Sequence, residues 1–589
     1  MLNRLLTLCL SLCCCVCGAY AAAETTPLKV SGITSLASGD FLLTNRGTKE
    51  LRLYDSAFES PKKVWAFENT PTGVAANGEY YFVTTFDEVG RVVRINAKSG
   101  QIDGELVLES GSSNPVISHD GRTLYVSNQY QGTVSKIDLA SFSNLGSVAV
   151  LREPKGMVES KDGDYLFVTN FLPAQRADLD TVCSAVSVIA LNGFEKVKDI
   201  RLVNGSNALR GIALSPDGDY VMVSHNLGRF QVPTNQLQQG WMNTSAISII
   251  DVKSQELMGA VLLDEPERGA AGIDHIASND HQVIVAHSGV HEISVLDYEP
   301  FIKKFLSVPD KMALNYDLTF LAGLRVRVPV EGNGPRDVYV VGDKAYVPTY
   351  FSDVMNVVDL DELEVASAVQ LQPERVESDV HKGEMYFNDA SYCFQNWQSC
   401  NGCHPGDGRT DGMNWDLMND GVGNAKNCKS MLYSHVTPPS MISGIRAMAE
   451  IAVRKGFTHI QFSQIPEENA VFVDEYLKSL RPVPSPYLVD GELSEKAQLG
   501  KKVFNDMGCV SCHSGIYYTD MNMYVIGDDV EFEAGWDTPT LVEVWRTAPY
   551  LFDGRAATME EVFSEHKHGI TKKLSKKNLE YLVEYVNSL

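Results

Sequence analysis

The chain has 589 residues, which is too long for one ordinary hydrophobic core, so several domains are expected. Its formal net charge of −25 at pH 7 argues against a nucleic-acid partner. An acidic surface would attract a basic partner protein, although surface acidity on its own is common in soluble proteins.

Residues 1–23 have the order of features of a secretory signal peptide: Arg4, then an apolar run over 5–16, then an alanine-rich end over 19–23. Removal of this segment would also remove five of the twelve cysteines. No later run of about 18 or more apolar residues exists, so we expect no transmembrane segment after signal removal. The sequence therefore predicts a periplasmic or secreted protein.

Residues 28–378 contain a repeated β-rich pattern. Asp-Gly pairs, typical of tight hairpin turns, precede several of the repeated runs. A small sheet of this kind buries both faces only when several sheets stack around an axis, so the pattern predicts a seven-bladed β-propeller. Insertions are expected in loops near 171–183, 226–244 and 298–330. The runs resemble the YVTN family of propeller repeats and begin, 40 to 62 residues apart, at Leu42, Phe82, Tyr125, Phe167, Met222, Ile284 and Tyr346.

Two Cys-x-x-Cys-His motifs follow, at 400–404 and at 509–513. In such a motif the two thiols bond to haem and the histidine becomes the proximal ligand of the iron, so the spacing is set by the porphyrin. A zinc or dithiol site is disfavoured because no second cysteine pair follows either copy. We therefore expect two covalent haem c groups, with proximal iron ligands His404 and His513, held by Cys400, Cys403, Cys509 and Cys512.

The surroundings of the two motifs are also repeated. A Gly-x-x-x-Phe segment at 383–387 and another at 500–504 precede them, and similar helical segments end at 480 and 589. These similarities predict two mainly α-helical cytochrome c domains over 379–481 and 497–589. The proline-rich linker between them, 482–496, is short enough to keep the two haems close. Cys393 and Cys428 flank the first motif and could form a disulfide.

The tandem motifs, together with residues 537–541 (DTPTL), 547–555 (TAPYLFDGR) and 558–561 (TMEE), resemble bacterial dihaem cytochrome c peroxidases and their MauG branch. The resemblance covers residues 379–589. It implies a periplasmic enzyme in which one haem has an open or displaceable site for hydrogen peroxide and the other supplies electrons. It also implies calcium near the haem interface, with no ligands that the sequence assigns.

The distal iron ligands decide between catalysis and electron transfer, because an iron with two strong ligands cannot bind peroxide. His459 and His568 each lie 55 residues after the proximal histidine of their unit. His566 competes with His568 at the second haem, and His435 and Met413 compete with His459 at the first. An acid/base carboxylate is also required, and Glu450, Glu543 and Glu561 are candidates, but the catalytic residues stay unknown.

These patterns favour a periplasmic dihaem oxidoreductase that reduces hydrogen peroxide or uses it to oxidise a partner. A small electron-donor protein or a membrane electron-transfer chain would supply the electrons. The first alternative is a non-catalytic electron-transfer cytochrome whose propeller docks a redox partner. The second alternative is a propeller with its own cofactor, although the propeller shows no cofactor motif.

Overall fold

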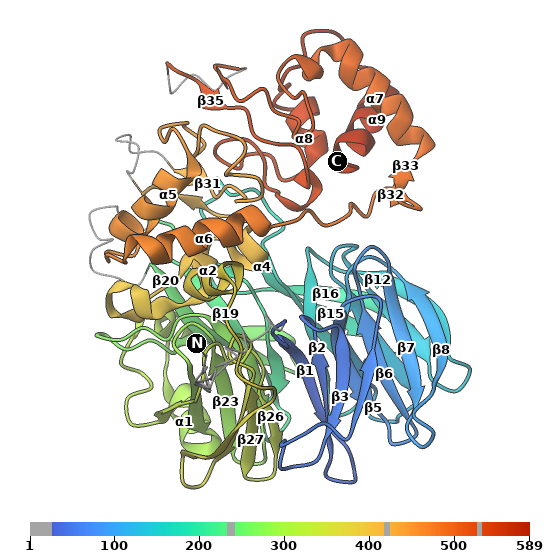
Figure 1. Cartoon of the computed structure of the whole chain (residues 1–589), viewed down its shortest axis with the longest axis vertical. Helices are drawn as coiled ribbons and strands as arrows, with labels where there is room; N and C mark the ends of the chain where they lie inside the picture. The colour runs from blue at the N-terminus through green and yellow to red at the C-terminus, as the bar shows by residue number, and fades with distance from the viewer. Residues whose placement is uncertain (1–25, 232–241, 418–424, 527–532) are drawn as a thin grey trace, which may run out of the picture.

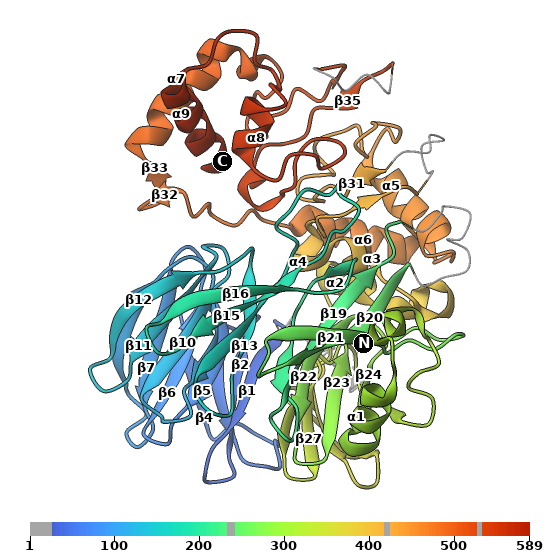
Figure 2. The same ribbon diagram turned by 180° about the vertical axis from the view of Figure 1, so that it is seen from behind.

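The computed structural model describes residues 26–231, 242–417, 425–526 and 533–589, so the predicted signal peptide lies outside the described residues. Figures 1 and 2 show a ring of β-sheets, coloured blue to yellow, and a smaller part that contains the long C-terminal helices. This smaller part lies on one face of the ring.

The predicted seven-bladed propeller is confirmed. Seven antiparallel sheets follow one another along the chain, each with its strands in sequence order. Blades 1 to 4 contain β1 (Val30–Ser35), β2 (Phe41–Asn45), β3 (Glu50–Tyr54) and β4 (Lys63–Ala66); β5 (Pro71–Ala76), β6 (Tyr80–Thr85), β7 (Gly90–Asn96) and β8 (Ile102–Leu108); β9 (Ser112–Ile117), β10 (Thr123–Asn128), β11 (Thr133–Asp138) and β12 (Ser143–Ala149); and β13 (Pro154–Glu159), β14 (Tyr165–Asn170), β15 (Ala185–Ala190) and β16 (Glu195–Arg201).

Blade 5 has an additional short strand, because β17 and β18 both pair with β19. Blades 5 to 7 contain β17 (Ser206–Asn207), β18 (Ile212–Leu214), β19 (Tyr220–Gly228), β20 (Asn243–Asp251) and β21 (Glu256–Leu262); β22 (Ile273–Ser278), β23 (Gln282–His287), β24 (Glu292–Asp297) and β25 (Arg325–Pro329); and β26 (Tyr339–Val341), β27 (Lys344–Pro348), β28 (Val354–Asp359) and β29 (Glu364–Gln370).

The repeated runs of the sequence form the second strand of each blade. These strands are almost wholly buried, because both of their faces pack against neighbouring blades. The predicted Asp-Gly turns are present: Gly121 and Gly163 have φ values of 72° and 77°, a left-handed conformation that glycine adopts without a Cβ clash.

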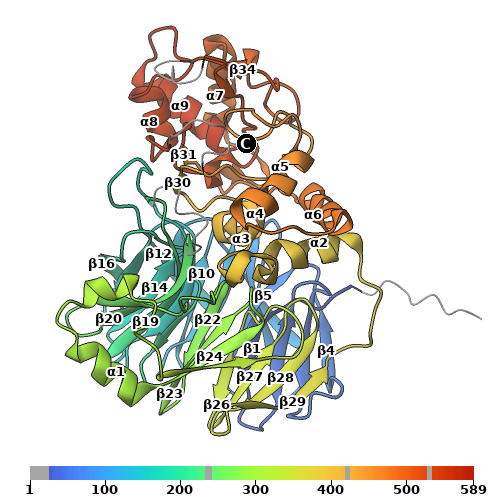
Figure 3. The same ribbon diagram turned by 90° about the vertical axis from the view of Figure 1, so that its left-hand side faces the viewer.

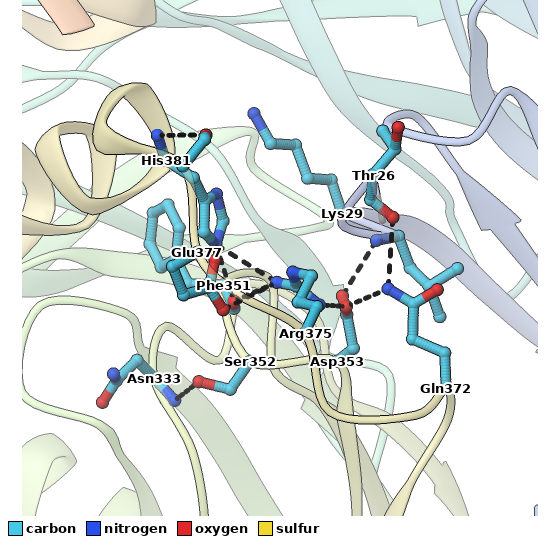
Figure 4. Close-up of polar contacts among 12 residues, drawn as sticks. Thr26, Lys29, Asn333, Phe351, Ser352, Asp353, Gln372, Arg375, Glu377 and His381 are labelled. Carbon is cyan, nitrogen blue, oxygen red and sulfur yellow. Dashed lines mark hydrogen bonds and ion pairs between the residues drawn. The ribbon is translucent and has the colours of Figure 1, made fainter. Parts of the chain in front are cut away.

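The ring closes where blade 7 meets blade 1. Phe41 of β2 contacts Tyr346 of β27, with ring centroids 4.3 Å apart. The buried carboxylate of Asp353 accepts the backbone N–H of Leu28 at 3.0 Å and the side-chain amide of Gln372 at 2.6 Å, and it pairs with Arg375 (Figure 4). These bonds join the first strand of the ring to the segment that leaves its last blade.

The predicted insertion near 298–330 is more ordered than a loop. The segment after β24 forms α1 (Tyr298–Ser307) and the 3₁₀ helix η2 (Lys311–Tyr316), and Phe301 and Phe305 of α1 are buried in the core of blades 5 and 6. Near 226–244, β19 and β20 pair as a long hairpin as far as Gly228 and Asn243, and most of the predicted insertion between them lies outside the described residues. Gly228, at the end of β19, lies against Met413 and Trp415 of the C-terminal part, which covers this hairpin.

The C-terminal part begins after β29. Its helices frame long irregular segments, so the expected description of residues 379–589 as mainly α-helical is too strong. The first unit contains α2 (Asp379–Asn388), η3 (Ala390–Tyr392), η4 (Phe394–Asn396), α3 (Cys400–Cys403), α4 (Pro405–Gly408), β30 (Asn414–Trp415), β31 (Lys426–Asn427), α5 (Ala449–Lys455), the π-helix η5 (Gly456–Ile460) and α6 (Glu467–Ser479). The second contains β32 (Leu488–Val489), β33 (Glu492–Leu493), α7 (Glu495–Met507), η6 (Cys509–Ser511), β34 (Met523–Tyr524), β35 (Trp536–Asp537), η7 (Val544–Arg546), α8 (Met559–Ser564) and α9 (Lys576–Asn587).

The two units share one helix crossing. Helix α2 packs on α6 at Gly383, and α7 packs on α9 at Gly500; a Cβ at either glycine would lie within 1.9 Å of a carbonyl oxygen on the other helix. Phe387 then contacts Tyr476 in the first unit, with ring centroids 5.3 Å apart, and an equivalent pair of rings occupies the second. Figure 3 shows the first unit between the propeller and the second unit.

Candidate functional site

His404 and His513 are held in the same orientation. The Nδ1 atom of each ring lies 3.1 Å from the backbone carbonyl oxygen five residues further along the chain, Arg409 O and Tyr518 O respectively. A carbonyl oxygen can only accept, so each Nδ1 donates a proton and each Nε2 keeps a lone pair for another partner. Burial lowers the pKa of both histidines, which favours the neutral ring that metals bind.

Each cysteine–histidine motif lines a largely apolar cavity. The first cavity contains Cys400, Cys403 and His404 on one side, with Trp415, Val453 and Leu477 among its apolar walls. All four motif cysteines are free thiols. Covalent haem requires thiols beside an apolar cavity and a histidine that faces it, so the residues of both motifs fit this group.

In the second cavity, His568 faces His513. Their ring centroids are 6.4 Å apart, and both residues line the cavity. Two imidazoles that share one metal ion through bonds of about 2 Å place their ring centres about 6 Å apart. Burial, with smaller effects of His513 and Arg555, lowers the pKa of His568 to about 4, so this ring is neutral at pH 7. The pair has the spacing of two axial ligands.

The first cavity has a different arrangement. His459 lines it from η5, but its side chain is exposed and its Nδ1 lies 2.7 Å from Thr458 Oγ1. The two cavities therefore differ in how firmly the second histidine is held.

The competing histidines have other partners. His435 Nε2 lies 3.0 Å from Asp474 Oδ1 in a buried hydrogen bond, and His566 Nε2 lies 3.2 Å from Arg555 O. The structure thus places His459 in the cavity of His404 and His568 in the cavity of His513. The competing histidines, His435 and His566, line neither cavity. Spacing alone could not separate these candidates, and their role as ligands stays a prediction.

The two cavities share a wall. Residues 427–430 and Thr540 line both, and Lys429 of the first unit forms an ion pair with Asp537 of the second at 2.5 Å. Cys428 in this wall lies 3.1 Å from Cys403 O and 3.5 Å from His404 Nδ1. It is a free thiol, as is Cys393, so the suggested disulfide between them is not formed.

Asp411 is a buried carboxyl group that the sequence analysis did not single out. It accepts hydrogen bonds from the backbone N–H of Met413 at 3.0 Å and from Trp415 Nε1 at 2.8 Å. Burial nevertheless raises its pKa to about 7. The signal was present as a Thr-Asp pair after each motif, but the equivalent Asp520 is only partly buried whereas Asp411 is fully buried, so burial distinguishes the first copy.

The propeller contributes to the first site. Asn243, at the start of β20, donates from Nδ2 to Cys403 Sγ at 3.2 Å and to Gln398 Oε1 at 3.2 Å. His225, inside β19, and His287, at the end of β23, are buried, and the ring nitrogens of both have protein partners, which agrees with a structural role.

A buried ionic network joins all three parts of the molecule. Arg409 of the first unit forms two hydrogen bonds with Glu543 of the second, at 2.8 and 2.9 Å. Arg546 pairs with Glu543 at 3.3 Å and with Glu153 of blade 4 at 2.9 Å. The carboxylate of Glu543 is therefore bonded to two arginines. None of the three candidate acid/base residues, Glu450, Glu543 and Glu561, lines a motif cavity.

Within the described ranges, no group of three or more His, Cys, Asp and Glu side chains has the arrangement of a metal site. The expected calcium has no ligand set there and stays a prediction. In the same ranges, every helix is too short or too polar to cross a membrane.

Comparison with known proteins connects the chain to one enzyme. Hydrazine synthase subunit gamma of Kuenenia stuttgartiensis is 26% identical over 277 residues, a match that covers 36% of this chain and 77% of that subunit. Subunit beta of the same enzyme is 25% identical over 171 residues, which covers 28% of this chain and 44% of that subunit. The chain is homologous to hydrazine synthase subunits.

A solved structure of Kuenenia stuttgartiensis hydrazine synthase supports the fold. The alignment has a TM-score of 0.52 and 21% identity, and it covers 58% of this chain and 98% of that chain. No protein-family model matches the sequence. Hydrazine synthase is not a cytochrome c peroxidase, so the homology indicates an enzyme-related role without supporting peroxide chemistry.

Proposed function

We propose that this protein is a periplasmic dihaem c-type oxidoreductase. The observation that carries the proposal is the repeated site: two apolar cavities, each with two free thiols and a histidine whose Nδ1 is bonded to a carbonyl oxygen. Cys400 and Cys403 would hold one haem and Cys509 and Cys512 the other. Bound haem c supplies an iron that exchanges single electrons and, where a coordination position is open, binds a small molecule.

The two sites have different proposed roles. His513 and His568 have ring centroids 6.4 Å apart and would both hold the iron of the second haem, which favours electron transfer at the second site. His459 is exposed and bonded to Thr458, which favours a displaceable ligand at the first site. The shared wall at 427–430 would keep the two haems close enough to exchange electrons. The first site is thus the proposed place of reaction.

Hydrogen peroxide is the proposed substrate at the first site, either reduced or used to oxidise a partner. A small electron-donor protein or a membrane electron-transfer chain would supply electrons. Homology to two subunits of one synthase supports assembly with further protein subunits. The alternative is electron transfer alone, and it is favoured if His459 binds iron firmly, because this residue also lines the first cavity.

Haem content and electron paramagnetic resonance of the purified protein test the proposal. We expect two c-type haems per chain, one low-spin ferric signal, and one high-spin signal that hydrogen peroxide converts. Two low-spin signals that do not change when hydrogen peroxide is added would support electron transfer alone. A chain without covalent haem, after expression with a cytochrome c maturation system, would overturn both the peroxide-dependent function and the electron-transfer alternative.

Mutation of His459 tests whether this residue is an iron ligand at the first site. His459→Ala should leave the low-spin signal of the second haem intact and change the spectrum of the first. His435→Ala is the matched control, because His435 is bonded to Asp474 and lies outside the cavity. Equal spectral changes in the two variants would contradict the assignment of His459.

A further inference from the structure

A third cavity lies on the axis of the propeller, apart from the two motif cavities. It has a volume of about 630 Å³ and shares no lining residue with either of them. First strands of the blades, including β1, β5 and β9, form its walls. Asn401, Gly406 and Asp407 of the C-terminal part line it as well, and Figures 1 and 3 show α4 over the corresponding face of the ring. We call it the axial chamber.

Three cationic side chains of the axial chamber have no carboxylate within ion-pair distance among the described residues: Arg46 after β2, Lys155 in β13 and Arg336 before β26. Arg46 makes no side-chain hydrogen bond there. Lys155 lies over the Phe171 ring at 4.3 Å and has no hydrogen-bond acceptor in the same ranges. These donors come from three different blades and face one space.

Arg336 is only partly satisfied. It donates one hydrogen bond to Asn388 Oδ1 at 2.9 Å and a weak one to Ser288 Oγ at 3.4 Å, and its guanidinium stacks on Tyr350 at 4.1 Å. A guanidinium has five N–H donors, so it retains capacity for a further acceptor.

The other charged groups of the axial chamber are largely paired. Arg210 lies 3.6 Å from Asp274, and Asp337 lies 3.6 Å from His275. Arg546 is engaged by Glu153 and Glu543, as described above. The three unpaired cations therefore set the local charge.

Two carboxylates of the axial chamber, Asp407 and Asp337, have no arginine or lysine within ion-pair distance among the described residues, and burial raises the pKa of Asp337. Burial would raise the pKa of Asp407, but Arg46, Arg336, Arg409 and Arg546 lower it to about 2. Burial and Arg210 lower the pKa of Lys155 to about 8. Burial is the larger cause for Lys155, so of these two shifts the one of Asp407 reflects the nearby positive charge. Three unpaired cations exceed the two carboxylates, Asp407 and Asp337, so the chamber has an excess of positive charge.

We propose that the axial chamber binds a small inorganic oxyanion between Arg46, Lys155 and Arg336. Buried cations without counter-ions are unfavourable, and an anion would remove this cost. Arginine forks match the oxygen geometry of planar and tetrahedral oxyanions, and charge-assisted hydrogen bonds are the strong ones. This site is distinct from the proposed haem cavities and does not depend on them.

Isothermal titration calorimetry of the full-length mature protein with sodium nitrate and with sodium phosphate tests the site. We expect saturable binding of at least one of them, and about tenfold weaker binding in both Arg46→Gln and Lys155→Met, because each loses a charged hydrogen bond. Arg201→Gln is the matched control, since Arg201 is an exposed residue of blade 4. The oxyanion affinity of this variant should equal that of the unchanged protein.

Asp407→Asn gives a test of opposite sign. Removal of this carboxylate takes away repulsion of the bound anion, so binding should tighten several-fold in a variant that keeps its folded structure. Thermal unfolding of each variant checks folding independently. The proposal is overturned by absence of saturable binding, by equal weakening in Arg201→Gln, or by unchanged or weaker binding in Asp407→Asn. Because haem content is measured separately, its loss would not be mistaken for failure of this site.

Discussion

The imidazole of His568 is the side chain on which the proposed electron-transfer role of the second site most depends. It faces His513 across an apolar cavity, while His566, two residues away, is bonded to Arg555 O. The carbonyl bond at His513 Nδ1 and the burial of both rings explain why neutral, metal-binding imidazoles face each other here.

We predict that His568→Ala removes the low-spin ferric signal of the second haem, because the iron would lose one of two strong ligands. His566→Ala should leave that signal unchanged. Low-temperature electron paramagnetic resonance measures both. Loss of the signal in His566→Ala alone would show that the neighbouring histidine is the ligand.

Lys155 provides a pH test of the axial chamber. It faces Arg210, Glu153, Arg546 and Asp407, and its pKa is lowered to about 8, so it is charged below that pH and neutral above it. Oxyanion affinity should therefore decrease as pH rises through about 8. Lys155→Arg keeps its charge and should remove this decrease. Titrations at pH 7 and pH 9 check it, and equal pH dependence in the two proteins would contradict the assignment.

At the scale of elements, each C-terminal unit depends on one close helix crossing. Gly383 and Gly500 let α2 and α7 approach α6 and α9 until a Cβ would lie 1.8 and 1.9 Å from the carbonyl oxygens of Phe472 and Tyr581. A backbone carbonyl cannot move away as the end of a flexible side chain can. An added methyl group would therefore force the two helices apart.

We predict that Gly500→Ala destabilises the second unit by about 1–3 kcal/mol, the usual cost of overpacking. Lys502→Ala is the control, because Lys502 is an exposed position of the same helix, and we expect stability to change by no more than about 0.5 kcal/mol. Thermal unfolding followed by circular dichroism measures both. A Gly500→Ala variant as stable as the control would mean that the crossing tolerates a methyl group.

At the scale of the whole molecule, charged side chains connect parts that lie far apart in the sequence. Glu543 bonds to Arg409 and Arg546, and Arg546 continues to Glu153 of the propeller. Val483 of the segment between the units also donates its backbone N–H to Glu543 at 2.9 Å. The network fixes both units to one face of the propeller.

We predict that Glu543→Gln lowers stability by about 3–5 kcal/mol, because removal of one partner leaves two buried arginines without full compensation. Glu560→Gln, at an exposed position of α8, should change stability by no more than about 0.5 kcal/mol. Denaturant unfolding measures both. A neutral Glu543→Gln variant would show that the network is not required to hold the parts together.

Much of the architecture could be predicted from the sequence because it rests on local patterns. The seven repeated strands and their Asp-Gly turns identified the propeller, since strand pairing and turn geometry depend on neighbouring residues. The repeated segments at 383–387 and 500–504 indicated two related units, and the structure has the same helix crossing in both. The long irregular segments were missed because cavity walls carry no periodic pattern.

Some residues of the candidate site could also be identified from local sequence patterns, whereas others could not. The two cysteine–histidine motifs could be identified from the amino-acid sequence, because their spacing is set within five residues. Only the tertiary structure decided that His459 and His568 reach the cavities while His435 and His566 do not, since this depends on where distant segments pack. It alone brought Arg46, Lys155, Arg336 and Asp407 around one chamber, because burial and long-range charge arise when separate blades and units assemble.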